Sequence, residues 1–135
     1  MTITMLNVLE LNGFYNNIKN KKLPFQVAYK FSKIIRLIQG DVDFFEKEMD
    51  KLLNEYGKRD ETGQFILTED NKGVVIQEEY IDKCRKKMNE LYHLPITIEG
   101  DISFTVEELD FLDITPQEIN ILMPFISDRK RENGK

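Results

Sequence analysis

The chain has 135 residues, of which 41% are hydrophobic and 32% are charged, and its formal net charge is −5. This length suits one domain with a modest hydrophobic core. The negative charge argues against nucleic acid as the main partner, because phosphate binding requires concentrated lysine and arginine. Cys84 is the only cysteine, and no apolar run approaches the ~20 residues of a membrane span. We therefore expect an intracellular, soluble protein without membrane contact.

The first expected helix covers residues 4–19, where apolar residues recur at helical spacing from Val8 to Ile18. Two features complicate this expectation. Residues 2–5 alternate between polar and apolar side chains, which leaves a short opening strand as an alternative, and Asn12-Gly13 is a turn signal inside the predicted helix. Residues 20–23 form a connector, after which Pro24 suits the first turn of the next helix.

The longest predicted element is a single helix from Pro24 to Tyr56. Its apolar positions step by three or four residues, with a mean of about 3.6, which is the period of an α-helix. They are Val27, Phe31, Ile34, Ile38, Val42, Phe45, Met49, Leu52 and Tyr56. At 1.5 Å per residue the helix is roughly 50 Å long. Gly57 follows it and is expected to end it in the left-handed conformation.

Shorter elements complete the predicted chain. Two β-prone runs, residues 65–67 and 74–76, flank a polar turn that ends at Gly73, which predicts a β-hairpin. A third helix, residues 77–92, covers about half of the long helix if the two are antiparallel. Residues 94–98 and 102–104 are predicted strands. Thr105 and Thr115 each precede a glutamate by three residues, the pattern of a capping box, so short helices are expected at 106–111 and 116–123.

The predicted fold class is therefore mainly helical α+β, with a long central helix, a hairpin, a shorter returning helix, one or two further strands and two short helices near the end. We expect one domain over residues 1–126 and a polar, flexible tail over residues 127–135.

The charges of the long helix are divided between its two halves. No Asp or Glu occurs between Leu11 and Gly40, whereas acidic residues dominate from Asp41 to Tyr56. This order opposes the helix macrodipole, which favours anions near the start and cations near the end. Partner-binding candidates are therefore the residues at the two ends of this charge gradient: Lys30, Lys33, Arg36, Asp43, Glu46 and Asp50.

Three interpretations of this layout stay open. In the first, two copies of the helix pair antiparallel across Gly40, so that each basic half faces an acidic half. In the second, the basic half contacts nucleic acid with the help of Phe25, Tyr29 and Phe31. Finally, the charges simply solvate an exposed face or pair within the chain, for instance with Glu78 and Glu79. A protein partner or self-association is favoured over nucleic acid, because Phe31 lies on the apolar stripe.

No residue pattern points to catalysis or to a cofactor. His93 is the only histidine, which rules out a two-histidine metal site, and it is expected at the end of the third helix as a surface or capping residue. Cys84 falls on an apolar stripe and is expected to be a buried, inert thiol. The carboxylates lack calcium-loop spacing, and no phosphate-binding glycine motif is present. We expect a protein that is not an enzyme and binds no cofactor or metal.

One resemblance covers about residues 23–126. It is carried by the runs LPFQVAYKFSKII and DVDFFEKEMDKLLNEYGKRDETGQF, by a turn at Gly73 and by the block ITPQEINILMPFI. Together these resemble a group of small, largely uncharacterised proteins encoded by tailed phages and prophages. The resemblance implies a phage protein that is made in the host bacterial cytoplasm and acts by binding other proteins, with the virion as a second expected location. The preferred role is a virion structural or assembly component. The alternative is an inhibitor of a host or anti-phage defence protein.

Overall fold

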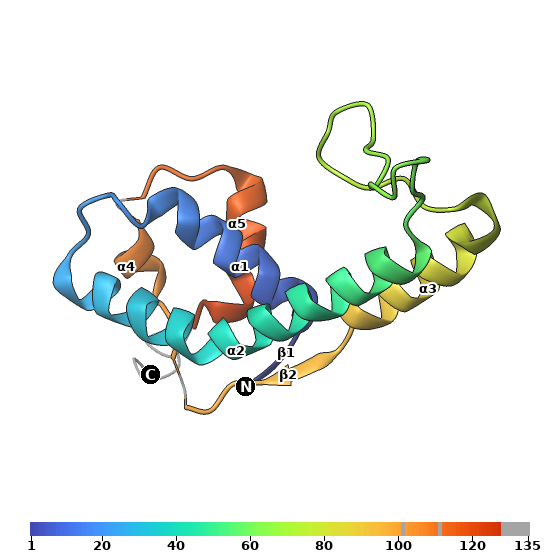
Figure 1. Cartoon of the computed structure of the whole chain (residues 1–135). Coiled ribbons are helices and arrows are strands. Elements are labelled where there is room, and N and C mark those ends of the chain that lie inside the picture. Colours follow the sequence, from blue (N-terminus) through green and yellow to red (C-terminus); the bar gives the residue numbers. More distant parts are fainter. Residues whose placement is uncertain (101, 111, 128–135) are drawn as a thin grey trace. The chain divides into compact units, whose positions relative to one another are not determined.

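A computed structural model describes residues 1–100, 102–110 and 112–127. The fold is mainly helical α+β, as the sequence predicts (Figure 1). The chain divides into two compact units that share one long helix, α2 (Phe25–Tyr56). The first unit comprises residues 1–42 and the segment from residue 95 onward, and the second comprises residues 43–94. The single domain expected over residues 1–126 stays a prediction.

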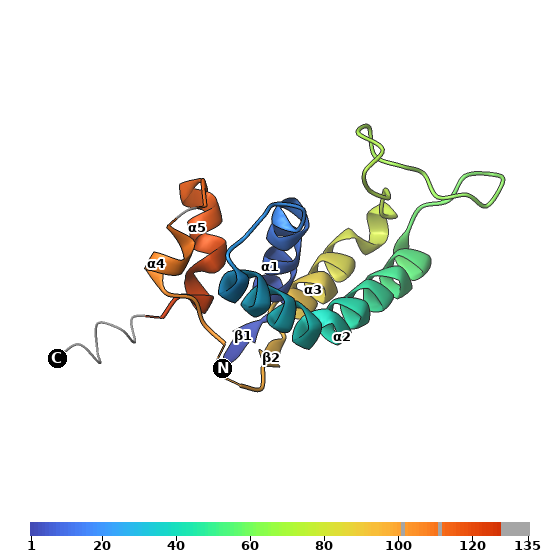
Figure 2. The same ribbon diagram turned by 90° about the vertical axis from the view of Figure 1, so that its left-hand side faces the viewer.

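The first unit opens with a strand and not with a helix. Strand β1 (Thr2–Thr4) pairs antiparallel with β2 (Pro95–Thr97), and Ile3 lies opposite Ile96 in this pair (Figures 1 and 2). Both isoleucines are buried, whereas the residues on either side of Ile96 are exposed. The opening strand that the sequence left as an alternative is therefore present, and the strand predicted over residues 94–98 is confirmed.

Helix α1 (Met5–Ile18) follows β1 directly. Thr4 caps it, because its hydroxyl oxygen accepts a hydrogen bond from the Asn7 amide at 3.2 Å while the Asn7 side chain accepts one from the Thr4 amide at 3.0 Å. Gly13 stays inside the helix, so the turn signal at Asn12-Gly13 does not interrupt it. The capped start and the buried face that includes Val8 outweigh the cost of one glycine, which is roughly 1 kcal/mol.

Two short helices lie near the end of the described chain, as expected. They are α4 (Val106–Leu109) and α5 (Pro116–Leu122), and a 3-10 turn, η2 (Met123–Phe125), follows α5. Both predicted capping boxes are formed. Helix α5 lies beside α1 (Figures 1 and 2). Phe111, the last residue of the first predicted helix, lies outside the described residues, as do residues 128–135 of the predicted tail.

No regular strand forms at residues 102–104. Phe104 instead makes one isolated parallel bridge with Ile126. The Phe104 amide donates to the carbonyl oxygen of Phe125 at 2.7 Å, and the Ser127 amide donates to the carbonyl oxygen of Phe104 at 2.8 Å. Ser127, the first residue of the predicted tail, is thus hydrogen-bonded to the fold. This pairing places Phe104 in the core.

Phe31 of α2 lies at the centre of the first unit's core. Its ring centroid is 4.5 Å from that of Phe104 and 6.2 Å from that of Phe14 in α1. All three side chains are at most 3% exposed. These aromatic contacts join α1, α2 and the segment before α4.

The second unit is built on a pair of helices. Helix α3 (Ile81–Tyr92) follows a 3-10 turn, η1 (Glu78–Tyr80), and together they occupy the predicted third helix. Tyr92 lies against Phe45, with ring centroids 5.3 Å apart, whereas Tyr80 lies against Tyr56, with centroids 5.2 Å apart. The order of these contacts shows that α3 runs antiparallel to residues 43–56 of α2. The third helix therefore covers only the second part of α2, as expected.

Residues 57–77, here called the ring segment, connect α2 to α3. The predicted pairing of 65–67 with 74–76 is present as an isolated antiparallel bridge between Leu67 and Val74. A third stretch adds to it. The Lys58 amide donates to the carbonyl oxygen of Val75, the Val75 amide to that of Ile66, and the Ile66 amide to that of Lys58. All three nitrogen–oxygen distances are 2.7–2.8 Å. The three backbone segments therefore close a ring.

Gly57 follows α2 but does not adopt the expected left-handed conformation. Its φ is not positive; the described glycines with positive φ are Gly63 and Gly100. A Cβ atom at Gly57 would lie 2.8 Å from the Phe65 ring and would also clash with the carbonyl oxygen of Leu53. Only glycine lets Phe65 of the ring segment pack this closely on the end of the helix.

The apolar stripe of α2 is covered along its whole length. Eight of its nine predicted positions are buried, and Met49 is half-buried. The first unit covers the stripe from Val27 to Val42, and the second unit covers it from Phe45 to Tyr56. A partner of α2 would therefore have to meet another face of this helix.

Candidate functional site

The ammonium group of Lys30 is hydrogen-bonded within the first unit. Its Nζ donates to Oε1 of Glu108 at 2.7 Å and to the carbonyl oxygen of Ser103 at 2.9 Å. The side chains of Lys30 and Glu108 are 31% and 17% exposed, so the ion pair is partly shielded from water. Pairing within the chain thus accounts for Lys30, although Glu108 is its partner and not the Glu78 or Glu79 that the sequence suggested.

Glu108 is held from two sides. Its Oε1 also accepts the Thr105 amide at 2.9 Å, which completes the cap of α4. Burial raises the pKa of this carboxyl, but the hydrogen bond and charge of Lys30 and the bonds from Thr105 outweigh burial, so the pKa lies below its ordinary value. Lys30 therefore joins the first half of α2 to the start of α4.

Lys33 and Arg36, unlike Lys30, are exposed. Arg36 donates to the Ser32 hydroxyl at 3.4 Å, which is a long bond within the same helix. Within residues 1–100, 102–110 and 112–127, neither cation forms an ion pair. Both positive charges are available to another molecule.

Two exposed aromatic side chains accompany Lys33. Phe25 is 82% exposed and Tyr29 is 57% exposed, and their rings stack with centroids 6.3 Å apart and an interplanar angle of 19°. The Nζ of Lys33 lies 6.0 Å from the centroid of the Tyr29 ring. We call Phe25, Tyr29 and Lys33 the aromatic–lysine surface. A hollow of about 420 Å³ adjoins it and is also lined by Ile102 and Ser103.

Phe31, which lies on the buried stripe, is a poor guide to these two aromatic residues of α2. The positions of Phe25 and Tyr29 in the sequence nevertheless indicate that they are exposed. Phe25 and Tyr29 each lie two residues from the stripe position Val27, and a step of two residues rotates a side chain by about 200° around a helix. The two rings therefore fall on the face opposite the core.

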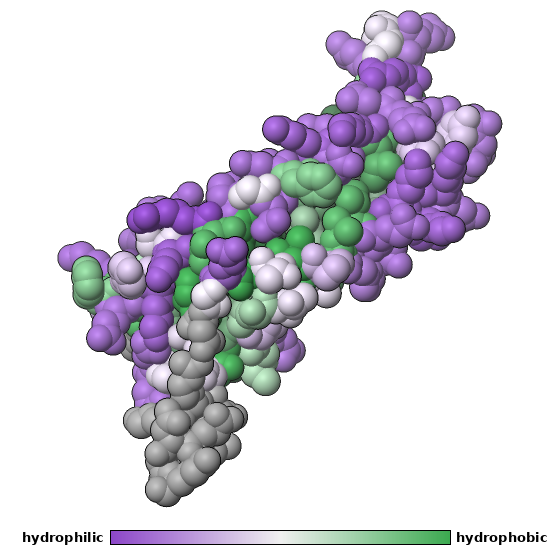
Figure 3. All heavy atoms as spheres, turned by 90° about the horizontal axis from the view of Figure 1, so that it is seen from below, coloured by the Kyte–Doolittle hydropathy of each residue, from purple (hydrophilic) through white to green (hydrophobic). Residues whose placement is uncertain are grey.

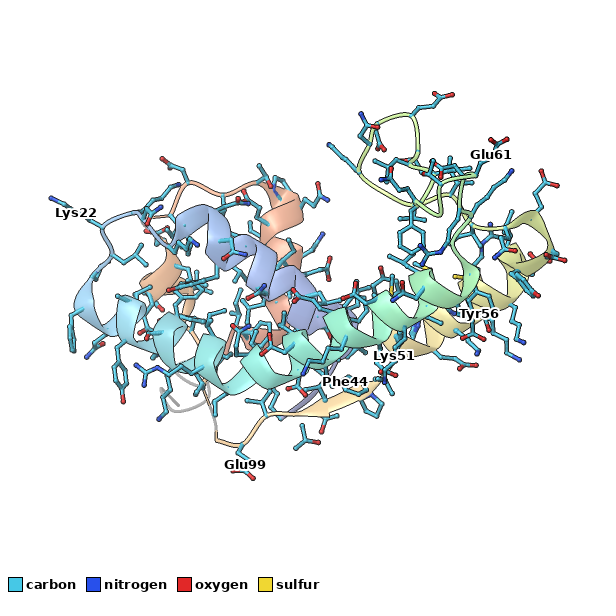
Figure 4. The ribbon with its side chains drawn as sticks, in the orientation of Figure 1. Lys22, Phe44, Lys51, Tyr56, Glu61 and Glu99 are labelled. Carbon is cyan, nitrogen blue, oxygen red and sulfur yellow. The ribbon has the colours of Figure 1, made fainter. Side chains whose placement is uncertain are left out.

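The acidic candidates belong to the second unit. Asp43, Glu46 and Asp50 are all exposed. In the described part of the chain no ion pair involves Glu46 or Asp50, whereas their neighbour Glu48 pairs with Lys51 at 2.8 Å. Phe44, in the same stretch, is 47% exposed. Figure 4 marks Phe44 and Lys51 on α2. The acidic and basic candidates thus lie in different compact units.

His93 and Cys84 occupy the expected kinds of position. His93 is exposed just after α3, and its Nδ1 lies 2.8 Å from the carbonyl oxygen of Asn89. Cys84 is 1% exposed, and burial raises the pKa of its thiol. Its Sγ lies 3.8 Å from the Met88 sulfur. A thiol that is buried and protonated at neutral pH is a poor nucleophile.

The acidic residues of the ring segment organise its turns. Oδ1 of Asp60 accepts from the hydroxyl and the amide of Thr62, at 2.6 and 2.8 Å, and the bond from the hydroxyl is the main cause that lowers the pKa of Asp60. Asp70 accepts in the same way from Thr68 and from the Lys72 amide. These carboxylates therefore accept hydrogen bonds from residues of their own turns. Glu61, at the tip of the first turn, is labelled in Figure 4.

The second unit also has an apolar groove of about 510 Å³ along α3. Ile76 of the ring segment and Ile81, Met88 and Tyr92 line it, and Arg85 is the charged residue among its lining side chains. Ile81 is 37% exposed. Figure 3 shows hydrophobic side chains reaching the surface between hydrophilic ones on the face that it draws.

Among the residues that the structure describes, no group of three or more His, Cys, Asp or Glu side chains is placed to hold a metal ion. None of the described helices combines the length and the apolar character that a membrane crossing requires. Comparison of the chain with protein-family models, with curated proteins and with solved structures finds no match.

Proposed function

We propose that the chain is a phage-encoded protein that acts without catalysis, through contacts with other proteins, as a virion structural or assembly component. It would be made in the host bacterial cytoplasm. The observation that supports the proposal is the exposure of large apolar side chains on the outer face of α2. The inner stripe of this helix is covered by its own chain, yet Phe25, Tyr29 and Leu37 are 82%, 57% and 41% exposed on the first unit. Large apolar side chains exposed among charges are typical of interaction surfaces.

Co-sedimentation tests this proposal. Particles and assembly intermediates of the encoding phage would be separated on a density gradient, and the chain would be measured in each fraction by quantitative mass spectrometry. The proposal expects a fixed ratio between the chain and one structural protein in at least one fraction. Absence from every particle and intermediate fraction would contradict the assembly role.

The alternative proposal is an inhibitor of a host or anti-phage defence protein. The exposed carboxylates Asp43, Glu46 and Asp50 favour it, because a concentrated acidic surface suits a basic site on such a target. Expression of the chain in the host should then relieve restriction of a challenge phage. No relief against any defence system in a tested panel would refute the inhibitor.

Self-association through α2 would fit either role. The exposed cations Lys33 and Arg36 of one copy would face the acidic stretch of another, antiparallel across Gly40. Gly40 has no neighbouring atom within 4 Å of its ideal Cβ position. Light scattering at low and high salt should show a dimer that dissociates as salt rises and that is lost in Lys33→Glu/Arg36→Glu. A monomer under all conditions would rule out self-association.

A further inference from the structure

The aromatic–lysine surface is the most exposed apolar feature among the described residues. Phe25 is 82% exposed, more than any other large hydrophobic side chain in the described part of the chain. A phenylalanine side chain this exposed keeps apolar surface in water that burial against a partner would remove. Tyr29 stacks against it at 6.3 Å, so the two rings form one apolar platform on the first unit.

The surroundings of this platform are positive. Lys33 approaches the Tyr29 ring, and Lys21 and Lys22 are exposed in the connector immediately before α2. Figure 4 shows the Lys22 side chain extending away from the connector. None of these three lysines forms an ion pair with another described residue. Lys30, which also lines the hollow, is already neutralised by Glu108. Three positive charges are therefore left for a ligand.

Aromatic side chains, lysines and a hollow suit one kind of ligand. An apolar side chain would rest on Phe25 and Tyr29 and enter the hollow of about 420 Å³, while carboxylates beside it would meet Lys33 and the connector lysines. We propose that the aromatic–lysine surface binds a short acidic segment of a partner protein that carries an apolar anchor residue. This inference rests on the proposed function and names the chemistry of the partner.

Single-stranded nucleic acid fits these observations less well. Bases would have to stack on rings that already stack on each other, with an interplanar angle of 19°. A polyanion would also be repelled by a protein of net charge −5, whereas a segment with few carboxylates would be repelled less. Binding of nucleic acid is therefore the competing outcome of the test.

Fluorescence anisotropy with four labelled probes tests the inference on the full chain. The probes are a short peptide of Glu, Leu and Phe, the same peptide with Lys in place of Glu, a peptide of Glu and Ser without apolar residues, and an oligothymidylate of similar length. We expect the first peptide to bind with a Kd about tenfold lower than that of each other probe. Equal binding of all probes, no binding of the first peptide, or tightest binding of the oligothymidylate would overturn the inference.

Matched variants locate the binding. Phe25→Ser and Lys33→Glu should each weaken binding of the first peptide by about tenfold or more, because one removes the platform and the other reverses a contact charge. Both residues are exposed, so thermal unfolding monitored by circular dichroism should stay close to that of the wild type. Phe44→Ser removes an exposed aromatic ring from the same helix and should leave peptide binding unchanged. Equal loss in Phe44→Ser would overturn the assignment of the site.

The peptide-binding test and the co-sedimentation test can fail independently of each other. If the chain is found in particles but the first peptide does not bind, the acidic-segment inference is wrong and the assembly role stands. If the peptide binds at the aromatic–lysine surface but the chain is absent from particles and intermediates, the inference stands and the assembly role is wrong.

Discussion

Replacement of Lys30 by methionine should destabilise the protein much more than the same replacement at Lys33. Lys30 makes two charge-assisted hydrogen bonds, to Glu108 at 2.7 Å and to the Ser103 carbonyl at 2.9 Å, from a side chain that is 31% exposed. Methionine keeps most of the apolar stem, so the change removes mainly the ammonium group and leaves the Glu108 carboxylate without its cation.

The expected loss follows from these contacts. A hydrogen bond to a charged group contributes about 1.5–3 kcal/mol, and an exposed ion pair about 0.2–1 kcal/mol. The Lys30–Glu108 pair lies between these cases, because both side chains are partly shielded. We expect Lys30→Met to lower the free energy of unfolding by about 2 kcal/mol. At roughly 3 °C per kcal/mol for a chain of this size, the Tm should fall by roughly 6 °C.

Urea unfolding followed by circular dichroism at pH 7 measures this difference. Lys33→Met is the matched control, because Lys33 is exposed on the same helix without an ion pair to a described residue, and it should change stability by at most about 0.5 kcal/mol. Adding Glu108→Gln to each variant completes a double-mutant cycle in which only Lys30 should couple to Glu108. Equal effects of the two lysine substitutions would refute the structural role of Lys30.

The ion pair should also show in the pH dependence of stability. The pKa of Glu108 is lowered in the folded protein, with 4.5 as its ordinary value. Its contribution is therefore present at pH values above the ordinary pKa and is lost as the pH falls through the lower folded-state pKa. As the pH falls from 6 through the folded-state pKa of Glu108, the free energy of unfolding should decrease more in the wild type than in the double variant Lys30→Met/Glu108→Gln.

Two further substitutions and one labelling test probe the rest of the fold. Gly57→Ala should destabilise the second unit by about 1–3 kcal/mol in urea unfolding, because its Cβ meets the Phe65 ring at 2.8 Å, and an unchanged midpoint would contradict this packing. Gly40→Ala should instead raise stability by about 0.5–1 kcal/mol, since the site is helical and open, and a loss would contradict the open space. The Cys84 thiol should react with a thiol reagent about a hundredfold more slowly in the native protein than in urea, because it is buried and its pKa is raised. Rapid native labelling would show that it is accessible.

Local patterns predict the helices of this protein well. The period of the apolar residues on α2 and the threonine–glutamate pairs at Thr105 and Thr115 depend on neighbours three or four residues away, and both are confirmed by the structure. The pairing of β1 with β2 joins Thr2 to Thr97. Periodicity indicates that each segment is extended, but it carries no information about which distant segment is its partner or in which register.

The same distinction applies to the candidate site. The sequence identifies Lys30, Lys33 and Arg36 as a group, but the carboxylate that neutralises Lys30 is 78 residues away and could not be assigned to it. The closed ring of residues 57–77 rests on backbone hydrogen bonds, which leave no trace in side-chain pattern. By contrast, the exposure of Phe25 and Tyr29 was predictable from their positions opposite the stripe.

Site-specific photo-crosslinking in the infected host tests the central claim, that the chain acts through defined protein contacts of α2. A photoreactive amino acid would be placed at Lys33 and at Phe44, both exposed, and at the buried Ile34 as the background control. Cross-linked peptides would then be identified by mass spectrometry. The proposal predicts adducts from position 33 to one defined segment of one phage protein, with little signal from position 34. Adducts from neither exposed position, or the same scattered background from all three, would contradict it.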